Sequence, residues 1–335
     1  MWRAVGGAVQ GSSHLKSDIP CQDKIYKLEI DGGIIAALAD GAGSAKLSHY
    51  GAERVTKTIC EFIGNNYDRL FSEDDGKLVK QELIEFILNE LETVCEEQQC
   101  EKKDLASTLL IVAIKNDTFI LAHLGDGVIG YLKGEELRIA STPDNGEFVN
   151  ETVFTTSANA LSSLQLKKGI LGEIIGFIMM SDGPEVSLYD KRTKQLANGI
   201  KNVMLSCSLL SVEEANENLH GILEDTLKKR TTDDCSLLFV VDKERVIKKL
   251  LSNEEYKRRI CGISSNKSSK KKWTLKRFKE LLEFIREPKT TDQIAKHFYT
   301  DKKYVKRKTQ SLQQYGIIQF ANDYYHSVIT FDENE

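Results

Sequence analysis

Four short acidic turns carry the residues of this chain that are most able to do chemistry. Each places a carboxylate where an apolar run begins or ends, and short apolar runs bounded by turn residues are typical of buried strands. Carboxylates brought together at strand ends repel one another unless a divalent cation neutralises them. A cluster of oxygen ligands favours Mg²⁺ or Mn²⁺ over zinc. The turns are Gln22-Asp23, Asp40-Gly41, Ser181-Asp182-Gly183 and Asp233-Asp234.

Taken singly, each turn is explained as readily by ordinary turn chemistry, because Asp and Gly are common turn residues. Their order is more specific, and it resembles the metal-dependent type 2C protein phosphatases, in particular the compact bacterial branch. The resemblance covers about residues 1–243. The segments that carry it are Gly11-Ser12-Ser13-His14 with Pro20-Cys21-Gln22-Asp23, Ala39-Asp40-Gly41-Ala42-Gly43-Ser44, Ser107-Thr108-Leu109-Leu110 with Leu124-Gly125-Asp126-Gly127, Met180-Ser181-Asp182-Gly183, and Thr232-Asp233-Asp234.

This resemblance implies a protein-serine/threonine phosphatase that hydrolyses phosphoserine and phosphothreonine with a metal-activated water. By motif position, Asp40 resembles the carboxylate that bridges two Mg²⁺ or Mn²⁺ ions, and the Gly41 carbonyl resembles a further ligand. Asp182 and Asp233 would complete the metal shell, while Asp23 would mainly orient metal-bound water. The implied partners are a phosphorylated protein substrate and a cognate serine/threonine kinase.

Asp126 resembles a residue that, with Asp182, holds a weaker third metal ion. A hairpin turn at Gly125-Asp126-Gly127 explains it equally well.

Three departures from the family pattern concern the metals, the leaving group and the phosphate. Gln22 stands where many relatives have glutamate, which removes one negative charge near the metals. Ala42 stands where better-known relatives have a histidine proposed to protonate the leaving group. The arginine that relatives use to grip phosphate is missing near the first motif, and His14 and Lys16 are the nearest substitutes. A lone histidine is more often structural than substrate-binding, so both readings of His14 stay open.

Elements that could position these residues follow from hydrophobic spacing. Apolar residues three and four apart predict helices over residues 46–63 and 83–94. Ser211 with Glu214 has the pattern of a capping box and predicts the start of a third helix. Strand runs interleaved with helices favour an α+β domain of two packed sheets with helices outside, and the family resemblance implies the same four-layer αββα sandwich. Residues 108–114, 118–124 and 128–132 are expected to form an antiparallel meander.

The C-terminal residues 273–330 have the pattern of a winged helix-turn-helix. Apolar residues between Leu275 and Ile285 predict a first helix, and Thr290 with Gln293 predicts a capped second helix. A third helix is expected over residues 301–315, followed by a two-stranded wing. Basic residues on the third helix are candidate nucleic-acid contacts, although a solvated face or a protein-docking surface fits as well. They are Lys302, Lys303, Lys306, Arg307 and Lys308.

Charge separates the two parts of the chain. Residues 1–266 have 31 Lys and Arg against 41 Asp and Glu, whereas residues 267–308 have 15 against 5. This asymmetry predicts two functions, with a connecting helix and polar linker over residues 244–272. The seven cysteines form no Cys-x-x-Cys pair, which argues against a zinc site or a disulfide framework. No apolar run approaches the ~20 residues that span a bilayer, so a cytoplasmic protein is expected.

Three functions remain open from the sequence. The first is a metal-dependent phosphatase whose C-terminal module recruits it to DNA or to a protein partner. The second is a DNA-binding regulator with a weak or inactive phosphatase-like sensor domain, and the third is a docking protein. Retention of Asp40, Asp182 and Asp233 favours the first, because a decayed site would be expected to lose at least one of them.

Overall fold

The computed structural model describes residues 2–143, 152–246, 275–314 and 317–327. Contacts divide the chain into two compact units. One comprises Met1–Cys207 and Val212–Asp242, and the other Ser208–Ser211 and Lys243–Glu335. The expected linker lies outside the described residues from position 247 to its end at 272.

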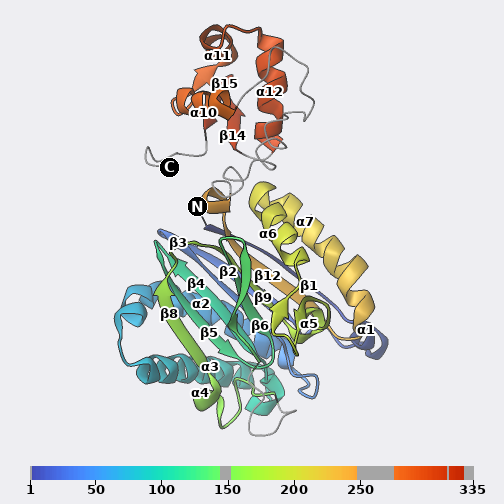
Figure 1. Ribbon diagram of the computed structural model, residues 1–335. Helices are drawn as coiled ribbons and strands as arrows, with labels where there is room; N and C mark the ends of the chain where they lie inside the picture. The colour runs from blue at the N-terminus through green and yellow to red at the C-terminus, as the bar shows by residue number, and fades with distance from the viewer. Residues whose placement is uncertain (1, 144–151, 247–274, 315–316, 328–335) are drawn as a thin grey trace. The chain divides into compact units, whose positions relative to one another are not determined.

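Two five-stranded antiparallel sheets form the centre of the first unit (Figure 1). Strands β3, β4, β9 and β12 are apolar runs buried on both faces, as expected when helices cover a sheet. One sheet has the order β1-β12-β9-β6-β7 and the other β2-β3-β4-β5-β8. The strands of the first are β1 (Trp2–Val9), β12 (Cys235–Asp242), β9 (Ile174–Met180), β6 (Val128–Lys133) and β7 (Glu136–Ser141); those of the second are β2 (Lys24–Ile30), β3 (Gly33–Ala39), β4 (Leu109–Lys115), β5 (Thr118–Leu124) and β8 (Gln165–Ile170).

Alternation along the strands sends side chains to two different cores. On β3, Ile34, Ala36 and Leu38 face a core shared with Phe177 and Leu238 of the other sheet. The intervening side chains of β3 face a second core, which the neighbouring helices complete. The two sheets therefore pack face to face.

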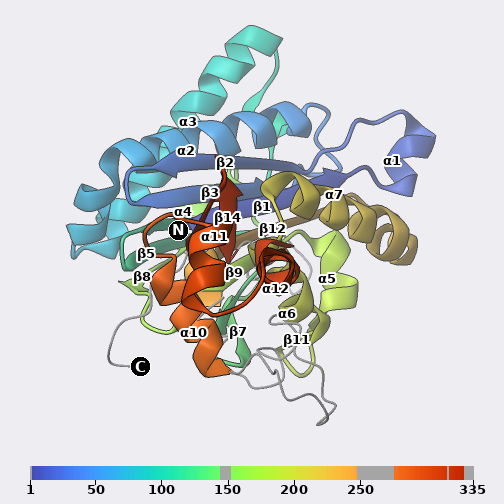
Figure 2. The same cartoon turned by 90° about the horizontal axis from the view of Figure 1, so that it is seen from above.

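Helices cover the outer face of each sheet, which gives four layers (Figures 1 and 2). On one side lie α2 (Ser48–Ser72) and α3 (Gly76–Gln98), whose buried positions recur every three or four residues. On the other side α6 (Gly199–Leu209) packs closely on β9, where a Cβ at Gly176 would lie 2.9 Å from the Met204 sulfur. With α6 lies α7 (Val212–Ile222). The αββα sandwich expected from the sequence is confirmed.

One expected connection is wrong. Residues 108–132 do not form a meander, because β5 pairs with β4 and β8 whereas β6 pairs with β7 and β9 of the other sheet. The chain crosses between sheets at Gly125-Asp126-Gly127. Gly125 has φ 112°, and a Cβ there would lie 2.5 Å from Thr108 Cγ2, so the crossing requires glycine. Asp126 is therefore not in a hairpin turn.

Shorter elements connect these layers. Two of them border the strand ends that carry the acidic turns, namely α1 (Ser12–Ser17) and α5 (Asp182–Leu188). The others are the 3₁₀ turn Lys102–Leu105, α4 (Ala160–Ser163), the small hairpin β10 (Tyr189–Asp190) and β11 (Gln195–Leu196), the π-helical segment Leu223–Leu227 and the 3₁₀ turn Lys228–Arg230.

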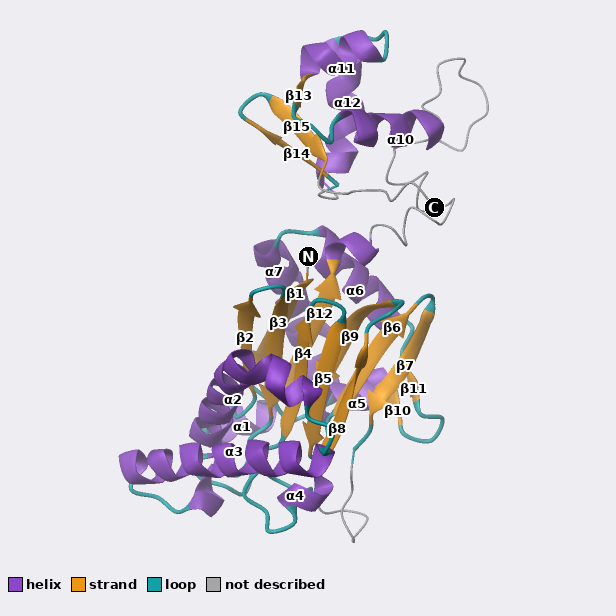
Figure 3. Cartoon of the chain, turned by 90° about the vertical axis from the view of Figure 1, so that its left-hand side faces the viewer, coloured by secondary structure: helices purple, strands orange, loops and turns teal. Residues whose placement is uncertain are grey.

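The second unit has three helices and a three-stranded sheet among its described residues (Figure 3). Thr290 and Gln293 form the expected capping box, which starts the second helix. Asn322 and Asp323 both have positive φ, as the turn of a two-residue hairpin requires. The elements are α10 (Leu275–Phe284), β13 (Lys289–Thr290), α11 (Thr291–His297), α12 (Lys302–Gln314), β14 (Ile318–Ala321) and β15 (Tyr324–Ser327), with sheet order β13-β15-β14.

Candidate metal centre and basic groove

Asp23 and Asp40 lie opposite each other at one end of the second sheet. Lys24 of β2 pairs with Ala39 of β3, so the residue before the first and the residue after the second extend from the same sheet edge. Asp40 is held by Thr108, whose hydroxyl accepts from the Asp40 N–H at 2.9 Å and whose N–H donates to the Asp40 carbonyl at 2.8 Å. The Gly41 N–H donates to the Gln22 carbonyl, which ties the first two acidic turns together.

The first sheet brings three more aspartates together at one end of its central strands. Met180 of β9 pairs with Val128 of β6 and with Leu237 of β12. Asp182 follows β9, while Asp126 and Asp233 precede the paired strands, so all three extend from one end of these strands.

A hydrogen bond across the two sheets joins these edges. The Ser181 hydroxyl donates to Asp23 Oδ2 at 2.8 Å and accepts from the Ser236 N–H at 3.1 Å. Both serines are buried. Packing of the sheets therefore gathers aspartates that are far apart in sequence.

Burial and mutual repulsion raise the pKa values of these carboxyls in the metal-free protein. Burial, and next the charges of Asp126 and Asp233, raise the pKa of Asp182 to about 7. The pKa of Asp23 is raised to about 6, mainly by burial, although hydrogen bonds from Ser181 and Asp40 oppose the rise. The pKa of Asp40 is raised well above its ordinary value by burial and by the charges of Asp23 and Asp182. A divalent cation bound among these carboxyls would relieve the same repulsion.

The donor set fits a hard divalent cation. Asp23 Oδ1 and Gln22 Oε1 are both buried without a hydrogen-bond partner in the structure, and such atoms are costly unless a ligand satisfies them. In the described residues, no three His, Cys, Asp or Glu side chains are yet spaced as a complete metal site. The Asp23 and Asp40 carboxyls instead lie close enough for each to shift the pKa of the other. Binding would therefore require proton loss and small carboxylate rotations.

The two expected substrate residues, His14 and Lys16, lie on α1. His14 Nδ1 is 2.9 Å from Asp234 Oδ1, without the geometry of a hydrogen bond, and its side chain is 12% exposed. Lys16 is exposed on α1. His14 therefore lies against a buried carboxylate, next in sequence to Asp233, and its contact with substrate stays a prediction.

Asp234 is a positioning residue that the sequence reasoning missed. Its two oxygens accept from the Gly11 and Gln22 N–H groups, both at 2.6 Å. It thereby fixes the segment that ends at Asp23 to the segment that carries Asp233. The Asp233-Asp234 pair is visible in the sequence. Its local sequence does not show which of the two carboxylates binds backbone N–H groups and which is free to bind a metal.

The side chain of Asp126 is held by a residue later in the chain, Thr152. The Thr152 hydroxyl donates to Asp126 Oδ2 at 2.6 Å. Position 126 therefore has a fixed carboxylate beside Asp182, which is compatible with the weaker third-metal reading.

Comparison with known families identifies the first unit. The sequence profile described as protein phosphatase 2C matches residues 10–224. The chain belongs to the protein phosphatase 2C family, and phosphatases of this family use Mg²⁺ or Mn²⁺.

Known proteins similar to the chain agree with this assignment. Serine/threonine-protein phosphatase 3 of Escherichia coli is 28% identical over 171 residues, which are 49% of this chain and 66%, just under two thirds, of that protein. The solved structure of the phosphatase Stp1 from Staphylococcus aureus has a TM-score of 0.51 at 14% identity and covers 72% of this chain and 95% of its own. A Caenorhabditis elegans sex-determining protein has a TM-score of 0.51 at 15% identity, covering 74% and 67%. At these identities the structures show a shared fold.

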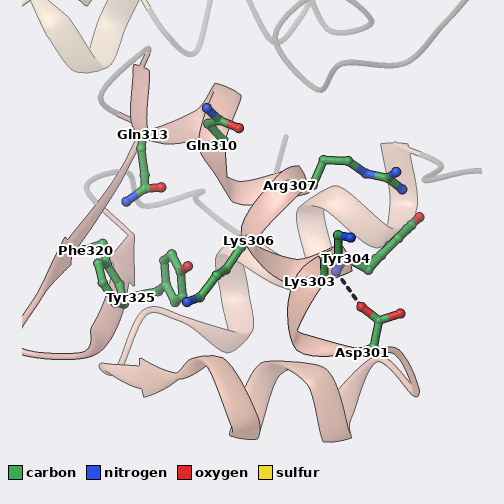
Figure 4. Close-up of a pocket in the computed structure, with 9 residues that line it drawn as sticks. All are labelled: Asp301, Lys303, Tyr304, Lys306, Arg307, Gln310, Gln313, Phe320 and Tyr325. Atoms are coloured by element: carbon green, nitrogen blue, oxygen red, sulfur yellow. Dashed lines mark hydrogen bonds between the residues drawn. The ribbon is translucent and has the colours of Figure 1, made fainter.

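A basic groove of about 650 Å³ lies in the second unit, between α12 and the β14–β15 hairpin (Figure 4). Its cationic side chains are Lys303, Lys306 and Arg307, and Figure 4 shows Lys306 extending toward Tyr325. The rings of Phe320 and Tyr325 lie 4.5 Å apart on the hairpin. The complete lining is Asp301, Lys303, Tyr304, Lys306, Arg307, Gln310, Gln313, Phe320 and Tyr325.

Two of the five expected basic residues lie outside the groove lining. Lys302 pairs with Asp292 at 2.7 Å, and the Lys308 ammonium lies 5.9 Å from the Tyr304 ring centre. Neither lines the groove.

Throughout the described ranges, no helix has the length and apolar character needed to cross a membrane.

Proposed function

We propose that the chain is a metal-dependent phosphatase that removes phosphate from phosphoserine and phosphothreonine in proteins. The observation that supports this most strongly is the convergence of Asp23, Asp40 and Asp182 from two sheets, with their pKa values raised and Asp23 Oδ1 left buried and unpaired. Such a cluster is unfavourable without a cation, so its retention points to metal use.

Each residue of the proposed centre has a distinct task. Asp40, Asp182 and Asp233, with the Gly41 carbonyl, would hold two Mg²⁺ or Mn²⁺ ions. When bound, these ions supply neutralisation of the phosphoryl oxygens and a water of lowered pKa. Asp23 would orient that water, because its carboxylate is fixed through Oδ2 to Ser181.

A third ion is proposed between two of the aspartates. Asp126 and Asp182 would share it, with Thr152 fixing the Asp126 carboxylate.

Hydrolysis of p-nitrophenyl phosphate by the purified full chain tests the proposed chemistry. EDTA should stop the reaction, and Mn²⁺ or Mg²⁺ should restore it. Ca²⁺ should not restore it, since it is larger and less exacting in geometry. A phosphothreonine peptide tests the substrate class. Hydrolysis that persists in EDTA, or restoration by Ca²⁺ alone, would contradict the metal centre.

We further propose that the second unit is a winged helix-turn-helix that recruits the enzyme to duplex DNA. Its support is the groove in which three cations lie beside the amides of Gln310 and Gln313. Cations contact phosphates, and side-chain amides on a helix can read base edges in a major groove. The domain division at residues 1–243, 244–272 and 273–330 is part of the same proposal.

A gel-shift titration with random-sequence duplex DNA at 50 and 200 mM salt tests the recruitment role. Affinity should fall steeply as salt rises, because each phosphate contact releases counterions. Absent or salt-insensitive binding would favour the docking alternative, in which a protein partner occupies the groove. DNA binding without any hydrolysis would favour a regulator with an inactive sensor domain. A cytoplasmic location and a cognate kinase also remain proposals.

A further inference from the structure

An ion pair between Glu185 and Lys191 lies close to the aspartate cluster and has no role in the proposed metal centre. Glu185 of α5 is 1% exposed, and its Oε2 lies 2.9 Å from the Nζ of Lys191. Lys191 belongs to the turn between β10 and β11 and has a side chain that is 72% exposed. The other oxygen of Glu185, Oε1, is buried without a hydrogen-bond partner.

Helical spacing places this pair next to the aspartates. Glu185 follows Asp182 by three residues on α5, so the two carboxylates share one face of the helix. The pKa of Lys191 is raised, chiefly by its hydrogen bond to Glu185, and the charges of Asp126 and Asp182 add to the rise. The ammonium group is therefore held in the field of the proposed metal ligands.

A phosphoryl dianion that approaches five aspartates needs positive charge from the protein as well as from metal ions. The two cationic side chains expected to provide it are placed differently, since His14 lies against Asp234 and Lys16 is exposed on α1. We propose that Lys191 contacts the phosphoryl group of the substrate and that Glu185 positions it. An ammonium has three donors, so pairing with Glu185 leaves two for phosphoryl oxygens.

Pairing with the buried Glu185 carboxylate also restricts the Lys191 side chain before substrate binds. A long lysine on a surface turn is ordinarily free to adopt many rotamers, and ordering it costs entropy. Glu185 offsets that cost before substrate binds, and its own burial is tolerated because the ammonium compensates one oxygen. A simple surface ion pair would contribute little and would leave phosphate affinity unchanged on removal.

This inference rests on the proposed phosphatase function, so its test uses two measurements on the full chain. One is the KM and kcat for p-nitrophenyl phosphate with Mn²⁺, and the other is the affinity for inorganic phosphate by isothermal titration calorimetry. Lys191→Met should raise KM and weaken phosphate binding by about tenfold, the size expected for one charge-assisted hydrogen bond. Lys191→Arg should preserve both values within about threefold, because charge is kept.

Controls separate a substrate contact from a structural pair. Arg192→Met changes an exposed cation in the same turn and should alter neither value. Glu185→Gln should raise KM less than Lys191→Met does. The double variant Glu185→Gln with Lys191→Met should have the same KM as Lys191→Met alone, because Glu185 acts only by positioning Lys191. Melting temperatures establish that each variant is folded, and Lys191→Gln supplies the same comparison should the methionine variant not fold.

The outcomes distinguish the two proposals. If the parent hydrolyses the substrate and Lys191→Met behaves like Arg192→Met, the Lys191 role is overturned and the phosphatase function stands. The Lys191 role is also overturned if Lys191→Met and Glu185→Gln both lower the melting temperature without changing the affinity for phosphate. If the parent neither hydrolyses the aryl phosphate nor binds phosphate, both proposals fall.

Discussion

The pKa values of the clustered aspartates make the stability of this chain dependent on pH. Asp23 and Asp182 have folded-state pKa values of about 6 and about 7, against an ordinary 3.8. Burial is the largest cause for both, and neighbouring carboxylates add to it. The folded protein therefore binds protons that the unfolded chain has already released above about pH 4.

Stability of the metal-free protein should consequently fall as pH rises from 4 to 8. A raised carboxyl pKa contributes stability below the unfolded value, and this contribution is lost as pH passes the folded value. For Asp182 the loss is on the order of 4 kcal/mol, because each tenfold change in proton affinity corresponds to about 1.4 kcal/mol. Urea unfolding in EDTA between pH 4 and 8 measures it. Saturating Mn²⁺, or the variant Asp182→Asn, should reduce the slope, and an unchanged slope in both would contradict the assignment.

Asp40→Asn should lower turnover by at least about a hundredfold, since even residues that only support metal ligands are worth 10–100-fold. It should not lower the stability of the metal-free protein, because it removes a carboxyl that burial and repulsion already disfavour. Circular dichroism, urea unfolding and p-nitrophenyl phosphate hydrolysis check both parts. Asp74→Asn, at an exposed position, is the matched control. A folded Asp40→Asn protein with parental turnover would remove Asp40 from the centre.

At the level of elements, close backbone contacts set the positions of the strand ends. A Cβ at Gly183 would lie 2.0 Å from the Asp234 carbonyl oxygen, and a Cβ at Gly11 would lie 2.3 Å from the Asp233 carbonyl carbon. Helix α5 and the entry to α1 therefore both press on the segment that carries Asp233. Glycine is required at these two positions by space, whereas φ is not the constraint.

Gly183→Ala should separate α5 from the start of β12 and misplace Asp182 relative to Asp233. Overpacking of this kind costs roughly 1–3 kcal/mol of stability, and the apparent Mn²⁺ affinity should fall by about tenfold, as for lost support of a metal ligand. Mn²⁺ titration of activity and thermal unfolding measure the two effects. Gly199→Ala at the start of α6 is the control, because nothing lies within 4 Å of its added Cβ. Equal behaviour of the two variants would refute the contact.

At the scale of the whole molecule, charge and chemistry are divided between two units. Residues 1–266 have ten more acidic than basic residues, and residues 267–308 have ten more basic than acidic. The aspartate cluster lies in the first unit and the basic groove in the second. We therefore expect metal-dependent hydrolysis of a small substrate to be independent of DNA binding.

Lys303→Gln with Lys306→Gln should weaken DNA binding and reduce its salt dependence by up to about two counterions, since each lysine contributes about one phosphate contact. Lys302→Gln with Lys308→Gln removes the same charge from outside the groove lining and should have a smaller effect. Gel shifts at two salt concentrations compare the pairs. Hydrolysis of p-nitrophenyl phosphate should stay at the parental rate in both. Equal losses of DNA binding would mean that net charge, rather than the groove, is responsible.

Much of the local structure could be predicted from sequence because its signals are local. The spacing of apolar residues predicted α2 and α3, although α2 extends nine residues beyond the expected end, to Ser72. Thr290 and Gln293 predicted their capping box from residues three apart. The order of the acidic turns indicated the family and its four layers, since each turn lies where a strand begins or ends.

Contacts between distant segments were decided by the tertiary structure alone. Ser181 reaches Asp23 across 158 positions, and Asp234 reaches Gly11 across 223. The crossing at Asp126 could not be predicted, because strand spacing does not reveal which sheet a strand joins. The contact of His14 with Asp234 could not be predicted either, because the two residues are far apart in the sequence. The sequence by itself determined which side chains could do chemistry, whereas sheet register and packing decided which of them lie together.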